Sequence, residues 1–274
     1  MPKVILLPLG GSQADQTVLA TARAAGHAHD SHLVALHVPQ GQSSRSATDT
    51  ERLDLLDGRE KAAMAAWKAF CVENNITITD EPGTAGMTSE WLRETGSETD
   101  WLVHHGRSAG LIVMGRDPDR GQSGMARIET ALMETGQPIM IAPRQGLTES
   151  LTGVVGIAWK DTREAAGAVR AALPFIKAAR LVVIFTVLEK THAVDHSHQR
   201  IARMLRWHNP HIRVQPLLEH SRPPIEVLMD AAHQSLCGLM VMGGYGHSKL
   251  REAVMGGFTR SVLDDAPLPV LMAH

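Results

Sequence analysis

Five glycines near the end of the chain have a spacing that suits anion binding. Gly243, Gly244 and Gly246 lie within four residues, and the nine residues HSKLREAVM separate them from Gly256 and Gly257. A glycine inside a helix or strand costs roughly 0.5–1 kcal/mol relative to alanine, so such clusters favour sharp turns or close approach of the backbone to another group. The pattern predicts two backbone pivots on either side of a short excursion.

The residues after Gly257, FTRSVLDDA, are predicted to form the last helix. The N-terminus of a helix presents unpaired N–H groups and about half a positive charge, which favours phosphate. Thr259 would add a hydroxyl donor beside these groups. We therefore expect the stretch to surround an anionic group with backbone N–H, although a glycine-rich turn in an α/β sheet can also be purely structural.

The composition predicts an ordinary soluble protein with a packed core. The chain has 274 residues, 43% of them hydrophobic, a formal net charge of −2 and a pI near 6.7. The length favours two domains, and the charge gives no electrostatic case for nucleic acid or an anionic membrane as a partner. No apolar run is long enough for a secretory signal or a membrane span, so the expected location is the cytoplasm.

Few residues suggest metal binding or covalent cross-links. Cys71 and Cys237 lie far apart without CxxC spacing, so we expect two buried thiols and neither a disulfide nor a zinc site. On a helix, His192 and His196 would share one face, four residues apart. No third ligand accompanies them, and no metal site is predicted.

The chain repeats itself. GLIVMGRD at 110–117 and GLMVMGGY at 238–245 share the pattern Gly-Leu-X-Val-Met-Gly, and QPIMIAP at 137–143 answers LPVLMAH at 268–274. Matched segments follow the same order in both halves, which indicates a duplication. The loop chemistry of 143–153 places the boundary between the halves there.

Short aliphatic runs alternate with helix-period segments in each half. Trp67 and Cys71 share one face of a predicted helix, and Leu228 and Leu236 are placed on the buried face of another. Buried strands alternating with amphipathic helices predict two doubly wound parallel α/β domains in tandem, of the Rossmann-like class. The strands are expected at VILLPL, HLVALHV, ITIT, GLIVMG and PIMIA in the first half, and at VVGIAW, LVVIFTV, IRVQPL, GLMVMG and PVLMA in the second.

In element order and glycine spacing the chain resembles the universal stress protein family, in particular its tandem members. The family pattern is Gly, two residues, Gly, nine residues, Gly, then Ser or Thr, and Gly243, Gly246 and Gly256 fit it. The resemblance implies an adenine nucleotide alpha hydrolase-like fold, with a degenerate domain at 1–145 and a glycine-motif domain at 151–274. It further implies binding of ATP or a related adenine nucleotide, with Mg, through Ala158, Trp159, Lys160, Val187, Met242, Gly243, Gly246, Gly256, Gly257, Phe258 and Thr259.

Several positions depart from the family pattern. Lys160 stands where an Asp is usual, and because Lys only donates hydrogen bonds, it weakens adenine recognition while keeping phosphate attraction. Gly257 replaces the Ser or Thr and so removes a hydroxyl donor. Trp159 would either cover a purine ring or fill the edge of the core. Gly10 and Pro118 stand at the Asp and second-glycine positions of the first half, so residues 1–145 are not expected to bind nucleotide in the family's manner.

Three functions stay open. The chain lacks the GxSxG, GxxxxGK[ST] and HExxH motifs, and no catalytic constellation is found, so we do not expect an enzyme. The first expectation is a stress-response sensor that binds an adenine nucleotide and changes its affinity for an unknown protein partner. The alternatives are a nucleotide-free interaction protein of the same fold and a weak ATPase or phosphotransferase. An intrachain pseudo-dimer is expected from the resemblance, and a further homodimer stays open.

Overall fold

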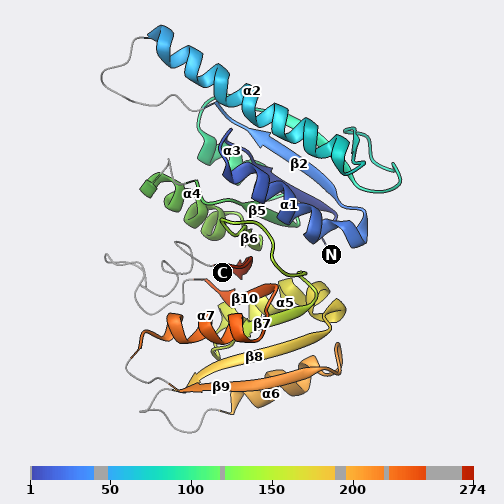
Figure 1. Cartoon of the computed structure of the whole chain (residues 1–274), viewed down its shortest axis with the longest axis vertical. Helices are drawn as coiled ribbons and strands as arrows, with labels where there is room; N and C mark the ends of the chain where they lie inside the picture. The colour runs from blue at the N-terminus through green and yellow to red at the C-terminus, as the bar shows by residue number, and fades with distance from the viewer. Residues whose placement is uncertain (1, 40–48, 118–120, 189–195, 219–221, 245–266) are drawn as a thin grey trace. The chain divides into compact units, whose positions relative to one another are not determined.

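The computed structural model describes residues 2–39, 49–117, 121–188, 196–218, 222–244 and 267–274. For residues 49–56, 121–123 and 187–188 the backbone alone is described. The chain divides into two compact units, Met1–Ala142 and Pro143–His274. Each unit is a layered α/β structure in which helices lie against a parallel sheet (Figure 1).

The first unit has the strand order β3-β4-β2-β1-β5-β6, with parallel pairing throughout. Its strands β1, β2, β5 and β6 are short aliphatic runs with nearly continuous burial, as expected for a sheet covered on both faces. The elements are β1 (Val4–Pro8), α1 (Ala14–Gly26), η1 (His27–His29), β2 (His32–His37), α2 (Asp49–Glu73), β3 (Thr77–Ile78), β4 (Thr88–Arg93), α3 (Glu98–Gly106), β5 (Leu111–Met114), α4 (Gly121–Glu134) and β6 (Ile139–Ile141).

The second unit has the order β11-β10-β7-β8-β9, again all parallel. Both sheets therefore confirm the prediction of doubly wound α/β units built on parallel strands. The elements are β7 (Val154–Ala158), α5 (Arg163–Ala178), β8 (Leu181–Leu188), α6 (Ser197–Leu205), β9 (Ile212–Leu218), α7 (Pro224–Gln234), β10 (Leu239–Gly243) and β11 (Val270–Ala273).

The helices of the second unit begin and pack as their sequences dictate. Thr162 caps α5, because its hydroxyl accepts a hydrogen bond from the N–H of Ala165. One face of α5 is buried, and each large apolar side chain removed from water there contributes about 1.5–3 kcal/mol. The buried apolar residues of α5 recur at intervals of one, three and four: Ala165, Ala168, Val169, Ala172, Phe175 and Ile176. No helix in the described part of the chain is long and apolar enough to cross a membrane.

Two sequence expectations about elements were wrong. The strand predicted at ITIT shrinks to the two residues of β3, and the strand that pairs with β2 is β4, whose sequence is TSEWLR. Because β4 contains many polar residues, a search for apolar runs misses it. Its buried Ser89 nevertheless has hydrogen-bond partners. The Ser89 hydroxyl accepts from the indole N–H of Trp67 at 2.8 Å and donates to the Leu33 carbonyl at 2.9 Å.

Leu236 was also placed wrongly. The helix α7 ends at Gln234, and Leu236 has a positive φ of 52° and is 58% exposed. A left-handed residue directly after a helix ends its periodicity, so Leu236 leaves the buried face that Leu228 occupies.

Candidate functional site

The candidate site of the second unit lies where its sheet reverses its winding. From β7 the chain runs outward through β8 to β9 and then returns to β10 on the other side of β7. In open α/β sheets, ligands bind outside the carboxyl ends of the strands at such a reversal. There Ala158 pairs with Met242, and Gly243 pairs with Ala273, so two predicted site segments are brought side by side.

Trp159 directly follows β7 and is tied to the unit at two points. Its backbone N–H donates to the Phe185 carbonyl at 2.8 Å, and its indole N–H donates to the Ser197 hydroxyl at 3.0 Å. The residue is only 8% exposed. Its indole therefore packs at the edge of the core and connects the loop after β7 with the first turn of α6.

The next two residues, Lys160 and Asp161, are exposed. Arg200 of α6 donates to the Asp161 carboxylate at 2.7 Å, and the two side chains are 69% and 55% exposed. A pair so open to water contributes only about 0–1 kcal/mol. Its effect is geometric, because it forms a second connection between the loop after β7 and α6.

Gly243 has a structural reason to be glycine. An added Cβ would lie 2.6 Å from the Ala165 nitrogen and 2.8 Å from the Glu164 carbonyl carbon, which are backbone atoms of the first turn of α5. The equivalent glycine of the first unit, Gly115, is packed in the same way against Ala14 and Val18 of α1. Close packing of a helix start against the strand end thus accounts for this glycine in both units.

Glu164 is buried beside Gly243 at the start of α5. Burial by itself would raise the pKa of its carboxyl, but hydrogen bonds outweigh that effect and lower the pKa. They come from the Arg163 side chain at 2.8 Å, from the backbone and from the Thr162 hydroxyl. A carboxylate near a helix N-terminus also interacts favourably with the helix dipole.

Of the remaining predicted site residues, the structure describes only some. Val187 pairs with Leu217 in the β8–β9 ladder, and its side chain is not described. One contact that the sequence did not suggest lies nearby: the His274 Nδ1–H donates to the Gly244 carbonyl at 3.1 Å. Outside the described residues lie Gly246, Gly256, Gly257, Phe258 and Thr259, as well as Pro118 of the first half and His192.

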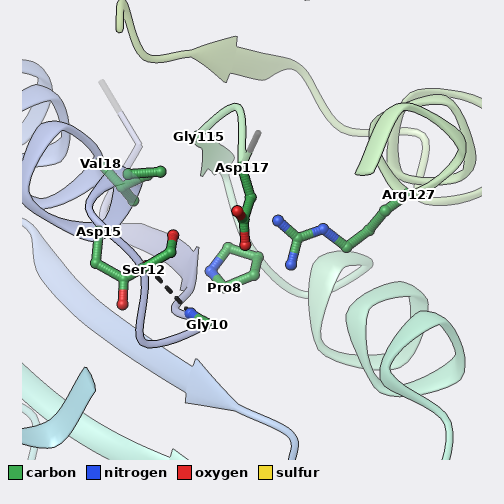
Figure 2. Close-up of a pocket in the computed structure, with 9 residues that line it drawn as sticks. Pro8, Gly10, Ser12, Asp15, Val18, Gly115, Asp117 and Arg127 are labelled. Carbon is green, nitrogen blue, oxygen red and sulfur yellow. Dashed lines mark hydrogen bonds between the residues drawn. The ribbon is translucent and has the colours of Figure 1, made fainter. Parts of the chain in front are cut away.

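The corresponding place in the first unit, between the ends of β1 and β5, is a small hollow (Figure 2). The hollow has room for about one water molecule, because the space open to the centre of a water-sized sphere is only about 10 Å³. It is therefore far smaller than a typical ligand pocket. Figure 2 shows the Arg127 guanidinium pointing toward Asp117 across the hollow. The lining residues are Pro8, Gly10, Ser12, Ala14, Asp15, Val18, Gly115, Asp117 and Arg127.

The Asp15 side chain accepts hydrogen bonds from the backbone N–H groups of this loop. Its carboxylate accepts the backbone N–H of Gly10 at 3.1 Å and that of Gly11 at 2.8 Å, and the residue is only 3% exposed. Burial raises the pKa of Asp15, although the two N–H groups and Arg127 act in the opposite direction. An internal carboxylate therefore already binds the backbone N–H groups that follow β1.

Within the described residues, no group of three or more His, Cys, Asp or Glu side chains is arranged to hold a metal ion. His196 immediately precedes α6, and it is exposed. Cys71 and Cys237 are free and buried, as the sequence indicated.

Comparison with known proteins finds a family match within the second unit. Residues 168–274 match the model of the Universal stress protein family. Among solved structures, the chain is similar to a universal stress protein from Archaeoglobus fulgidus DSM 4304, with a TM-score of 0.75 and 17% identity over 98% of this chain and 95% of that chain. It is also similar to a putative universal stress protein from Pseudomonas aeruginosa UCBPP-PA14, with a TM-score of 0.59 and 14% identity over 99% and 93% of the two chains.

Identities this low establish a shared fold and leave ligands and activity undefined. A search of curated protein sequences found no match. Residues 168–274 thus match the Universal stress protein family model, and the fold of the whole chain is similar to that of the two solved structures.

Proposed function

We propose that the second unit binds an adenine nucleotide, ATP with Mg or a related species, and that the protein is a cytoplasmic stress-response sensor. The observation that carries this proposal is the position equivalent to Asp15. The two units can be aligned on a pair of equivalent hydrogen bonds. The Leu9 N–H donates to the Leu36 carbonyl in the first unit, and the Trp159 N–H donates to the Phe185 carbonyl in the second. In that alignment Ala165 replaces Asp15, so no carboxylate from this position occupies the loop after β7.

Charge and spacing support the same site. Lys160 is exposed beside the strand ends and adds a positive charge, which attracts phosphate. The family match spans 242–259, where Gly243, Gly246 and Gly256 keep the family spacing. Residues 1–145 would act as a degenerate partner domain, because Asp15 takes up the N–H groups that a ligand would need.

A nucleotide-free interaction protein is the second candidate, and Trp159 favours it. The indole is buried and bonded to Ser197, so it offers little surface for a purine ring. Packing against α5 also explains Gly243 without any ligand. In this alternative, the second unit keeps the family fold and serves through its outer surface alone.

Calorimetric titration of the nucleotide-stripped protein with ATP and magnesium tests the proposal. Binding near one site per chain is expected, and it should disappear in Gly256→Val while circular dichroism stays unchanged. Gly167→Val is the matched control, because an added Cβ at Gly167 meets no atom within 4 Å. Absence of both heat and thermal protection at millimolar ATP would favour the nucleotide-free candidate.

The same samples distinguish binding from turnover. A sensor binds ATP and releases it unchanged over the time of the titration. Release of ADP above a no-protein control, lost in Gly246→Val, would instead indicate a weak ATPase or phosphotransferase.

A further inference from the structure

The charge of the second unit is concentrated in one segment. Between Asp195 and Glu219 the sequence contains no acidic residue, although the whole chain has a net charge of −2. A run without acidic residues in a slightly acidic protein creates a local positive potential. The segment contains Arg200, Arg203, Arg206 and Arg213, together with His196, His198, His208 and His211.

The helix α6 places part of this charge on one outer surface. Its inner face buries Ile201, Ala202 and Leu205, and α6 packs against β8 and the edge strand β9 (Figure 1). The opposite side is exposed along α6 and along the turn that follows it, which contains Arg206 and Trp207. Positions three and four apart are neighbours on such a surface, and the exposed neighbours are Arg203, Met204, Arg206 and Trp207, which we call the α6 outer face.

Trp207 is the largest apolar group on the α6 outer face, and it is 87% exposed. By contrast, Trp67 and Trp159 are buried and hydrogen-bonded, and the Trp101 indole N–H donates to the Thr95 carbonyl at 2.9 Å. Met204 beside Trp207 is 42% exposed. Folding of the unit gives no account of this exposure, because a buried indole would contribute far more to stability.

The arginines of this face form no ion pair within the residues that the structure describes. Arg200 is engaged with Asp161, whereas Arg203 and Arg206 form no ion pair with any residue in the described part of the chain. Each therefore presents a full positive charge beside Trp207. Two guanidinium groups around an exposed indole offer both charge pairing and apolar contact to one partner.

The residue types indicate what kind of partner fits. Trp, Met and Arg are enriched at protein–protein interfaces and supply most binding hot spots, while Lys, Glu and Asp are depleted there. Nucleic-acid surfaces carry larger basic stripes than two free arginines, and the pI near 6.7 argues against such a partner. Guanidinium groups bind carboxylates in a paired, directional way.

We propose that the α6 outer face is a docking surface for an acidic protein segment that also carries an aromatic or aliphatic side chain. The carboxylates pair with Arg203 and Arg206, and the apolar side chain packs on Trp207 and Met204. This surface is separate from the nucleotide site and does not require it, so either proposal stands if the other fails.

A labelled random copolymer of glutamate and tyrosine serves as the probe, with fluorescence anisotropy of the full chain in the absence of nucleotide. Binding is expected, together with protection of Trp207 from iodide quenching. The double variant Arg203→Glu/Arg206→Glu, and separately Trp207→Ala, should each weaken binding at least about tenfold, as hot-spot residues do. The control Arg170→Glu changes an exposed arginine of α5 and should alter affinity less than about twofold.

Three results would overturn the proposal. The first is absence of copolymer binding by the wild-type chain. The second is equal weakening by Arg170→Glu, which would show a general effect of net charge. The third is tighter binding of an oligothymidylate or of phosphatidylserine vesicles than of the copolymer, lost in the double variant, which would assign the face to nucleic acid or membrane instead.

Discussion

The loops after β1 and β7 leave equivalent strands and then differ in what their backbone contacts. In the first unit, Gly10 and Gly11 donate both N–H groups to Asp15, a carboxylate from the following helix. In the second unit the equivalent helix position is Ala165, and the loop residues Lys160 and Asp161 are exposed. The loop after β1 is therefore bonded to the start of its own helix through Asp15, whereas the residues at the equivalent positions after β7 are exposed.

The two units thus share one architecture, although the loops that follow β1 and β7 differ. Gly115 and Gly243 are both needed for the close approach of a helix start, so they persist in both units. In the loop after β1, Gly11 is also constrained, because its φ is +74° and an added Cβ would contact the backbone of Arg59. At the equivalent position after β7 stands Asp161, which is exposed. The same architecture thus accommodates different loops after equivalent strands.

The largest expected effect tests the packing that the two units share. Gly243→Ala should destabilise the second unit by about 3 kcal/mol or more, because the new Cβ meets immobile backbone atoms of α5. Gly115→Ala should cost the first unit less, about 1–3 kcal/mol, since Val18 and Ala14 side chains are its nearest neighbours. Scanning calorimetry of both variants, with Gly167→Ala as control, measures the difference. Equal losses of stability in Gly243→Ala and Gly115→Ala would show that the surroundings of the two glycines adjust equally well to a new Cβ.

A second prediction concerns Asp15. Asp15→Ala should destabilise the first unit by about 1–3 kcal/mol, because Gly10 and Gly11 lose their acceptor. Burial raises the pKa of Asp15 above its ordinary 3.8, so the folded protein holds this proton more tightly than the unfolded chain. The part of the stability that comes from this tighter proton binding is complete below about pH 3.8 and is lost as the pH rises through the higher pKa of the folded state.

Urea unfolding of wild type and Asp15→Ala at several pH values measures this dependence. The difference in unfolding free energy between the two proteins should narrow from acidic to neutral pH. Asp161→Ala, at an exposed loop position, is the control and should change little. A difference that widens toward neutral pH would mean that the N–H groups outweigh burial at Asp15.

A third prediction exchanges loop chemistry between the units. Ala165→Asp should introduce the internal carboxylate of the first unit and weaken ATP binding by about tenfold, or about 1.4 kcal/mol. Lys160→Ala should also weaken ATP binding, by a smaller factor, because it removes the positive charge that attracts phosphate. Titration calorimetry measures both. Unchanged affinity in both variants would place the nucleotide, if bound, away from the loop after β7.

The smallest effect is expected at the two cysteines. Burial raises the pKa of the Cys71 thiol, and it raises that of Cys237 to about 12. Because the thiolate is the reactive form, neither residue should react appreciably with a disulfide reagent in the native protein at mildly alkaline pH. Counting released chromophore with and without denaturant checks this. Rapid reaction of one thiol in the native state would reveal local opening of its unit.

The sequence predicted the architecture well because periodicity and burial determine it. Nearly continuous apolar strands such as β1 and β10 are legible without any structure. It missed β4, whose Thr88 and Ser89 are polar but internally bonded, and it extended α7 to Leu236 across a left-handed residue. Both errors arise where tertiary hydrogen bonds or a single backbone angle override the pattern.

The site was less predictable, since its decisive contacts join distant segments. The roles of Ser197 and Arg200 depend on where α6 begins relative to β7, which spacing alone does not give. Asp15 was not singled out from the sequence, because its role depends on its hydrogen bonds back to Gly10 and Gly11, which the structure shows.

The contacts from Trp159 to Ser197 and from Asp161 to Arg200 attach the loop after β7 to the first turns of α6. The helix therefore joins the strand ends, at its first turn, to Arg206 and Trp207, which follow its other end. A change in the position of α6 would alter both places, and coupling between two ligands through such a change is reciprocal. If a partner at Trp207 changed the affinity of the loop for its ligand, that ligand would change the affinity for the partner by the same factor.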